Sequence, residues 1–151
     1  MAKERFLYLP VGLPADEAHP QGSTAYRPTV LVRVFAASFG PIRVPCVLDT
    51  GADCCLLPSG IAKSLGFDLA SLPQSSAKGI GNQAIDVFYG HVTIRIGDSL
   101  NFEARVGFSD GLQRVGIGIL GQTGFFDQFH VEFRLAEGIF TIEPAAKPAI
   151  Q

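Results

Sequence analysis

The 151-residue sequence predicts an all-β fold with one or two short helices. Its clearest signal is a repeated alternation of apolar and polar residues, which is the period of strands that bury one face. Seventeen glycines and ten prolines, with no tryptophan, indicate many turns between short strands. The length fits one domain, and 47% hydrophobic with 17% charged residues is a globular balance.

The N-terminal residues 1–27 are expected to form an irregular lead-in to this domain. Prolines at positions 10, 14 and 20, and a fourth directly after the segment at position 28, interrupt any regular pattern there. The run Phe6-Leu7-Tyr8-Leu9 is apolar enough to add an edge strand, either in this chain or on a partner subunit. The domain itself is assigned to residues 28–143, and residues 144–151, with two prolines, are expected to fray.

Alternation is clearest in four segments, which we interpret as half-buried antiparallel strands. They are residues 30–35, 91–96, 102–106 and 130–135, followed by a last strand at 138–142. Two short helices are expected between them. Pro58 opens the first, in which Ile61 and Leu65 share a face. The second is expected after Gly121, where Phe125 and Phe129 are four residues apart.

One segment carries a candidate for chemistry: Val47-Leu48-Asp49-Thr50-Gly51-Ala52-Asp53. A buried strand that ends in a lone carboxylate is costly unless the charge is used or neutralised. A companion segment, Gly118-Ile119-Leu120-Gly121, again runs two apolar residues into a glycine. The plain alternative is that Asp-Thr-Gly is an ordinary turn, since Asp and Gly both favour turns.

Together the two segments resemble those of the retropepsin-like aspartic proteases, of the free-standing cellular or bacterial kind. The resemblance implies a half-barrel fold in which Asp49 is catalytic and the Ile119-Leu120-Gly121 segment crosses behind it. Because the chain holds one Asp-Thr-Gly, the resemblance implies a homodimer that pairs Asp49 with its symmetry mate. The implied activity is an aspartic endopeptidase that binds polypeptide as an extended strand.

The resemblance also gives roles to the residues that follow Asp49. The Thr50 hydroxyl is expected to bond across the dimer axis, and Gly51 to let its backbone approach the substrate. Ala52 and Asp53 are assigned to substrate binding at the end of the cleft. For Asp53, the alternative is a solvated loop charge.

A flap, the hairpin that closes over substrate in this family, is expected around Gly79-Ile80-Gly81. Two glycines around one branched residue suit a flexible tip whose backbone can bond a peptide while Ile80 covers the cleft. The alternative is an ordinary hairpin turn.

Two features depart from the family pattern. Retroviral members usually carry Arg after the glycine of the second segment, paired with the acid that matches Asp53, whereas this chain has Gln122. A glutamine can hydrogen-bond Asp53, but a charge-assisted pair is lost. Neighbouring Cys54 and Cys55 are expected to be buried, with oxidation that blocks activity as the alternative.

Composition excludes several classes of partner. A net charge of −2 and a pI near 5.9 give no electrostatic case for nucleic acid or an anionic membrane. No 18-residue apolar run is present, and three closely placed cysteines favour a reducing cytoplasm. The histidines show no zinc spacing, so we expect neither metal nor cofactor.

Two further hypotheses stay open. The chain could be a dimeric module of the same fold that binds extended peptides with little or no turnover. It could also process itself by cleavage within residues 10–28.

Overall fold

A computed structural model describes residues 2–78 and 81–146, and it is mostly β, as predicted. The strands are β1 (Glu4–Leu7), β2 (Leu9–Leu13), β3 (Ser23–Arg27), β4 (Thr29–Ala36), β5 (Phe39–Leu48), β6 (Leu56–Pro58), β7 (Gln74–Lys78), β8 (Ala84–Ile96), β9 (Leu100–Ser109), β10 (Gly118–Leu120), β11 (Phe129–Arg134) and β12 (Ile139–Pro144). The helices are α1 (Ser59–Ser64) and α2 (Asp110–Gln113), with 3-10 turns at Leu69–Ser71 and Leu135–Glu137.

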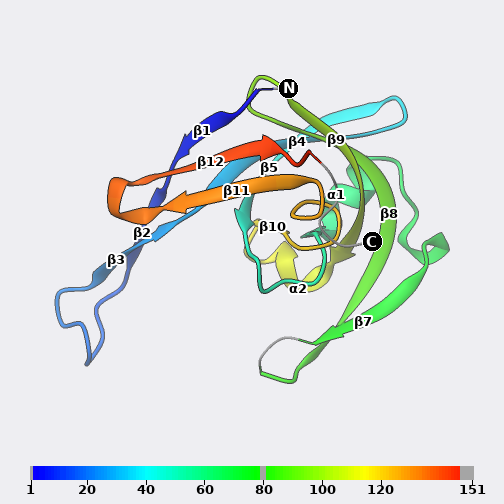
Figure 1. Ribbon diagram of the computed structural model, residues 1–151. Coiled ribbons are helices and arrows are strands. Elements are labelled where there is room, and N and C mark those ends of the chain that lie inside the picture. Colours follow the sequence, from blue (N-terminus) through cyan, green and yellow to red (C-terminus); the bar gives the residue numbers. More distant parts are fainter. Residues whose placement is uncertain (1, 79–80, 147–151) are drawn as a thin grey trace.

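A seven-stranded sheet forms the body of the molecule, in the order β4-β5-β10-β6-β9-β8-β7 (Figure 1). β4 also pairs with β8, so the sheet curls back on itself as a half-barrel does. Inward-facing residues alternate along the strands, as the pattern predicted: Val30, Val32 and Val34 on β4 are all buried. The remaining core side chains include Ile94, Ile96, Phe102, Phe108, Leu57 and Phe125.

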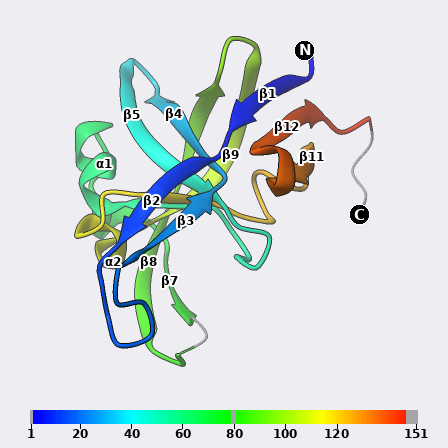
Figure 2. The ribbon, with the colours of Figure 1, turned by 90° about the vertical axis from the view of Figure 1, so that its left-hand side faces the viewer.

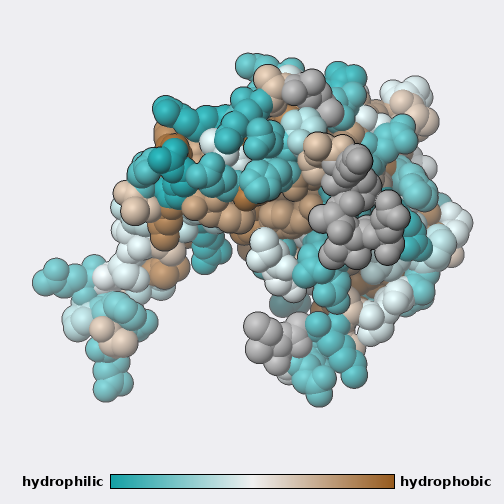
Figure 3. All heavy atoms as spheres, in the orientation of Figure 1, coloured by the Kyte–Doolittle hydropathy of each residue, from teal (hydrophilic) through white to brown (hydrophobic). Residues whose placement is uncertain are grey.

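Residues 9–27 form a separate two-stranded hairpin, β2–β3, which we call the N-terminal arm. It projects away from the body (Figure 1). The space-filling view shows a hollow between the arm and the body (Figure 3). The lead-in expected to be irregular thus contains three strands, since β1 precedes the arm.

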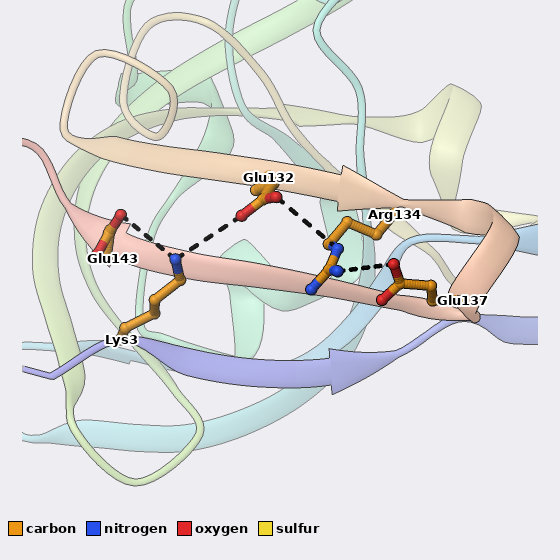
Figure 4. Close-up of polar contacts among 5 residues, drawn as sticks. All are labelled: Lys3, Glu132, Arg134, Glu137 and Glu143. Carbon is orange, nitrogen blue, oxygen red and sulfur yellow. Dashed lines mark hydrogen bonds and ion pairs between the residues drawn. The ribbon is translucent and has the colours of Figure 1, made fainter.

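A second sheet, in the order β1-β12-β11, lies at one side of the body (Figure 2), and Phe140 and Ile142 on β12 belong to the same buried core. Its inner face is aromatic: Phe6 stacks on Phe140 with ring centroids 5.5 Å apart, and Phe140 is fully buried. On its outer face Lys3 lies 3.8 Å from both Glu132 and Glu143, and so links the three strands (Figure 4). These ion pairs are exposed, so each contributes at most about 1 kcal/mol.

Glu4 joins the second sheet to the body. Its carboxylate accepts hydrogen bonds from the backbone N–H groups of Asp98 at 2.8 Å and Ser99 at 3.5 Å. These residues form the turn between β8 and β9, more than 90 positions along the chain. A carboxylate that accepts backbone N–H groups makes stronger hydrogen bonds than a neutral acceptor.

The first expected helix is present as α1, which begins after Pro58 and ends before Leu65. The second helix, expected after Gly121, is absent from that position, and the prediction is wrong there. Residues 122–128 form turns instead. Gly124 has a φ of 101°, which breaks the helical path, yet Phe125 and Phe129 still stack at 5.2 Å.

The second helix, α2, lies earlier in the chain, at Asp110–Gln113. The Ser109 hydroxyl caps it by accepting a hydrogen bond from the N–H of Gly111. No helix in the described part of the chain is long and apolar enough to cross a membrane.

Candidate active site

β5 carries Asp49 from the core to the surface. Leu48 at its end is buried, whereas Asp49 is exposed. Backbone bonds hold the chain on both sides of this step: Leu48 donates to the carbonyl of Pro28, and Asp49 donates to the carbonyl of Leu120 at 3.0 Å. The backbone of Asp49 is therefore held in place at the end of β5.

The Gly118–Leu120 segment forms β10, which lies between β5 and β6. Ile119 pairs in parallel with Val47 and antiparallel with Leu56. Residues 72 positions apart, Ile119 and Val47, thus lie side by side directly behind the Asp49 turn. This is the crossing that the two apolar segments predicted.

Gly121 ends this crossing at a point that admits no side chain. A Cβ atom there would lie 2.3 Å from the carbonyl oxygen of Cys54 and 2.7 Å from that of Ala52. Both neighbours are backbone atoms, which cannot rotate away. The glycine is therefore required for the two segments to approach each other.

The Asp49 carboxylate is oriented by its own turn. One oxygen, Oδ1, accepts a hydrogen bond from the N–H of Gly51 at 2.9 Å, and the Asp49 carbonyl accepts one from Ala52. Thr50 and Gly51 are exposed beside it. The Asp-Thr-Gly segment thus does form the turn that its residues favour, and this turn leaves the Asp49 carboxylate fixed and exposed.

Gln122 binds the Asp49 turn from the second segment. Its Nε2 donates to the carbonyl of Thr50 at 2.9 Å, and its backbone N–H donates to the carbonyl of Ala52 at 2.8 Å. The expected partner of this side chain, Asp53, does not receive the bond. Asp53 is exposed, and its backbone carbonyl accepts from the N–H of Thr123.

The cysteines differ in exposure, although all three are free thiols. Cys46 and Cys55 are fully buried, and burial raises the pKa of Cys55 to about 12. Its Sγ accepts a hydrogen bond from the N–H of Gly121 at 3.4 Å. Cys54 is only half-buried, so the expected burial of the pair holds for one member.

Tyr89 is a neighbour of the site that sequence reasoning missed. Its hydroxyl lies 3.8 Å from Cys54 Sγ, and the guanidinium of Arg105 stacks 4.4 Å from its ring centroid. Burial, followed by the contact with Cys54, raises the pKa of the Tyr89 hydroxyl. No spacing signal links positions 54 and 89, because β8 and the site loop meet only in three dimensions.

The segment expected to be a flap lies on the β7–β8 hairpin, in which Ser76 pairs with Asp86 and Lys78 with Ala84. Gly79 and Ile80, two of the three residues assigned to its tip, lie outside the described residues. Gly81 is exposed, and a Cβ atom built on it would meet nothing within 4 Å. The hairpin end of β7 and β8 extends beyond the body in both ribbon views (Figures 1 and 2).

No group of three or more His, Cys, Asp or Glu side chains is placed to hold a metal ion within residues 2–78 and 81–146.

Known proteins share both the sequence pattern and the fold. The family model described as aspartyl protease matches residues 34–123, a span that includes Asp49 and Gly121. A retropepsin-like aspartic protease from Rickettsia conorii has a similar structure, with a TM-score of 0.52 at 16% identity over 93% of this chain and 92% of that one. EIAV protease complexed with the inhibitor HBY-793 gives a TM-score of 0.47 at 23% identity, over 64% of this chain and 82% of that one. No curated protein matches the sequence.

The half-barrel, with its Asp-Thr-Gly turn and crossing glycine segment, defines a retropepsin-like acid-protease fold. The chain belongs to the aspartyl protease family.

Proposed function

We propose that the protein is an aspartic endopeptidase that works as a homodimer, with Asp49 of each subunit in one active site. The observation that carries the proposal is the placement of Asp49: it is fixed at a strand end, oriented by Gly51 and exposed on the single chain. Carboxylate hydrolysis of a peptide bond needs two carboxyl groups with different protonation. One subunit supplies one, so a single chain is expected to be inactive.

In the dimer the two Asp49 carboxyls would share a proton, since like charges about 3 Å apart cannot both ionise. The ionised carboxylate takes a proton from water as the water oxygen attacks the peptide carbonyl carbon. The protonated carboxyl gives its proton to the carbonyl oxygen, which yields a tetrahedral diol. The carbon–nitrogen bond then breaks: the nitrogen takes a proton from one carboxyl of the pair, and one hydroxyl of the diol gives its proton to the other carboxylate as the product acid forms.

Substrate would bind as an extended strand between the two subunits and the β7–β8 hairpins. In this proposal Gly79, Ile80 and Gly81 form the flap tip, and Thr50 bonds across the two-fold axis. Gly51, Ala52 and Asp53 would contact the substrate backbone. The exposure of Thr50, Gly51 and Asp53 supports these roles, because a group that meets a partner or substrate must be accessible.

The three free thiols support a reducing compartment as the place where the protein works, and we propose the cytoplasm.

The test compares wild type with Asp49→Asn, using a diverse peptide pool from about pH 4 to pH 7, the range for a shared-proton pair. Asp68→Asn is the matched control: its side chain caps a 3-10 turn by accepting from the N–H of Ala70, a bond that Asn can keep. Mass spectrometry identifies the products at several protein concentrations.

The expected result is cleavage by wild type and by Asp68→Asn, none by Asp49→Asn, and a rate that rises faster than linearly at low concentration. Equal products from wild type and Asp49→Asn would remove Asp49 from the chemistry. Peptide binding by both without products from either would favour the non-cleaving peptide-binding module.

A further inference from the structure

The N-terminal arm lacks a sheet to support it. β2 pairs only with β3 among the described strands, and together they make a two-stranded sheet of their own. An isolated two-stranded hairpin is marginally stable in water, and it becomes stable when its apolar face packs on something else. The arm therefore requires a surface that the rest of the described chain does not supply.

β2 lines one face of the arm with apolar side chains. Leu9, Val11 and Leu13 alternate along this strand, and their partners on the same face of β3 are Arg27, Ala25 and Ser23. Leu9 is 49% exposed and Leu13 is 39% exposed. The opposite face carries Tyr26, which pairs with Pro10.

Exposed apolar side chains also cluster around the arm. Of the nine large hydrophobic residues that are exposed in the described part of the chain, four lie on β2 or on the strands just before and after the arm: Leu7, Leu9, Leu13 and Leu31. The hollow between arm and body opens beside this region, and apolar surface borders its upper edge (Figure 3). Apolar surface gathered around a concavity marks an interaction site rather than a random scatter.

We propose that the occupant of this hollow is a second copy of the chain, and that the Leu9–Val11–Leu13 face of each arm packs on the other subunit. This rests on the proposed function, in which the active site is incomplete without a second copy. In a two-fold dimer the contact is reciprocal, so each leucine acts twice. The arm contact would then keep the two subunits paired, and with them the two Asp49 turns, although Asp49 itself is not part of the arm.

The test uses a double variant, Leu9→Thr with Leu13→Thr, because threonine removes apolar surface but retains strand propensity. Tyr26→Thr is the matched control, since Tyr26 is 57% exposed on the opposite face of the same arm. Sedimentation velocity over a range of concentrations gives the dimer dissociation constant, and circular dichroism checks the fold.

The double variant is expected to raise the dissociation constant at least about 100-fold, because four leucines are lost per dimer. Tyr26→Thr is expected to change it less than about 3-fold. An equal dissociation constant for wild type and double variant would overturn the proposal. So would an unchanged dimer that cleaves long polypeptides less well, which would assign the arm to substrate.

Hydrogen exchange on the wild type provides a second measurement that needs no variant. Amides of β2 and β3 are expected to become protected as the protein concentration crosses the dimer constant. Unchanged exchange of the arm alongside a clear monomer–dimer transition would overturn the arm contact. The same result would leave the proposed protease intact, since the dimer itself and the Asp49→Asn comparison are measured separately.

Discussion

Gln122 donates its side-chain amide to the backbone carbonyl of Thr50, and so ties the second glycine segment to the Asp49 turn. The backbone N–H of the same residue binds the carbonyl of Ala52, two residues further on. One glutamine thus holds the turn at two points. An arginine at this position, as retroviral members usually have, would pair with the acid at the end of the loop, Asp53, rather than with the backbone at Thr50.

Replacing Gln122 with alanine is expected to lower the free energy of unfolding by about 0.5–1 kcal/mol, since the lost hydrogen bond is exposed. Gln21→Ala, at an exposed glutamine in the loop of the arm, is the control and is expected to change little. Urea unfolding measures both. Equal stability of the two variants would mean that the amide–carbonyl bond contributes nothing.

Gly121→Ala is expected to be far more damaging. The added methyl group would lie 2.3 Å from a backbone oxygen, so β10 or the Cys54 segment must shift. Overpacking of this kind costs about 3 kcal/mol or more. Gly12→Ala is the control, because a Cβ atom there meets nothing within 4 Å. Thermal unfolding of both variants measures the difference, and a similar loss in each would contradict the close crossing.

The N-terminal strand offers a comparison of two anchors. Glu4→Ala removes the acceptor for two backbone N–H groups in the β8–β9 turn and is expected to cost about 1–3 kcal/mol. Lys3→Ala removes only exposed ion pairs and is expected to cost less than about 1 kcal/mol. Unfolding in urea at neutral pH ranks the two, and a larger loss for Lys3→Ala would reverse this assignment.

Alkaline pH is expected to destabilise the fold through Cys55. Burial raises its pKa from 9.0 to about 12, so between these values the folded state keeps a proton that the unfolded state releases. Stability is therefore unaffected by this group below pH 9. Above that value stability falls, by about 1.4 kcal/mol per pH unit for one such thiol.

Comparing Cys55→Ala with wild type between about pH 8 and pH 11 isolates this effect. The variant starts from a lower stability because it loses buried volume, so the slopes are compared rather than the absolute values. A shallower decline in the variant is the expected result. Parallel declines would mean that the Cys55 thiol does not contribute.

Much of the fold could be predicted from local pattern. Alternation located β4, the second half of β8, and β9, β11 and β12, because each buries one face against the core. Pro58 located the start of α1, and the spacing of Ile61 and Leu65 indicated its buried face. The Asp49 turn and the glycine segment behind it could also be predicted, because Asp49-Thr50-Gly51 and Ile119-Leu120-Gly121 resemble the two motifs of a known family.

The remainder depends on contacts that no local period encodes. α2 has four residues and one serine cap, which is too short for a helical pattern. The phenylalanines after Gly121 have helical spacing, but Gly124 turns the chain and they stack without a helix. The bond from Gln122 to Thr50 joins residues 72 positions apart, and its partner is a backbone carbonyl that carries no side-chain signal.

The exposed loop between β2 and β3, residues 14–22, is where a cut within the N-terminal region would fall most easily. Such a cut would break the covalent link between β1–β2 and the rest of the polypeptide, but hydrogen bonds would keep both strands attached. β1 stays paired with β12, β2 with β3, and Glu4 with the β8–β9 turn. A nicked molecule would thus run as two fragments under denaturing conditions and as one particle in native solution, and the missing piece could be added back as a synthetic peptide.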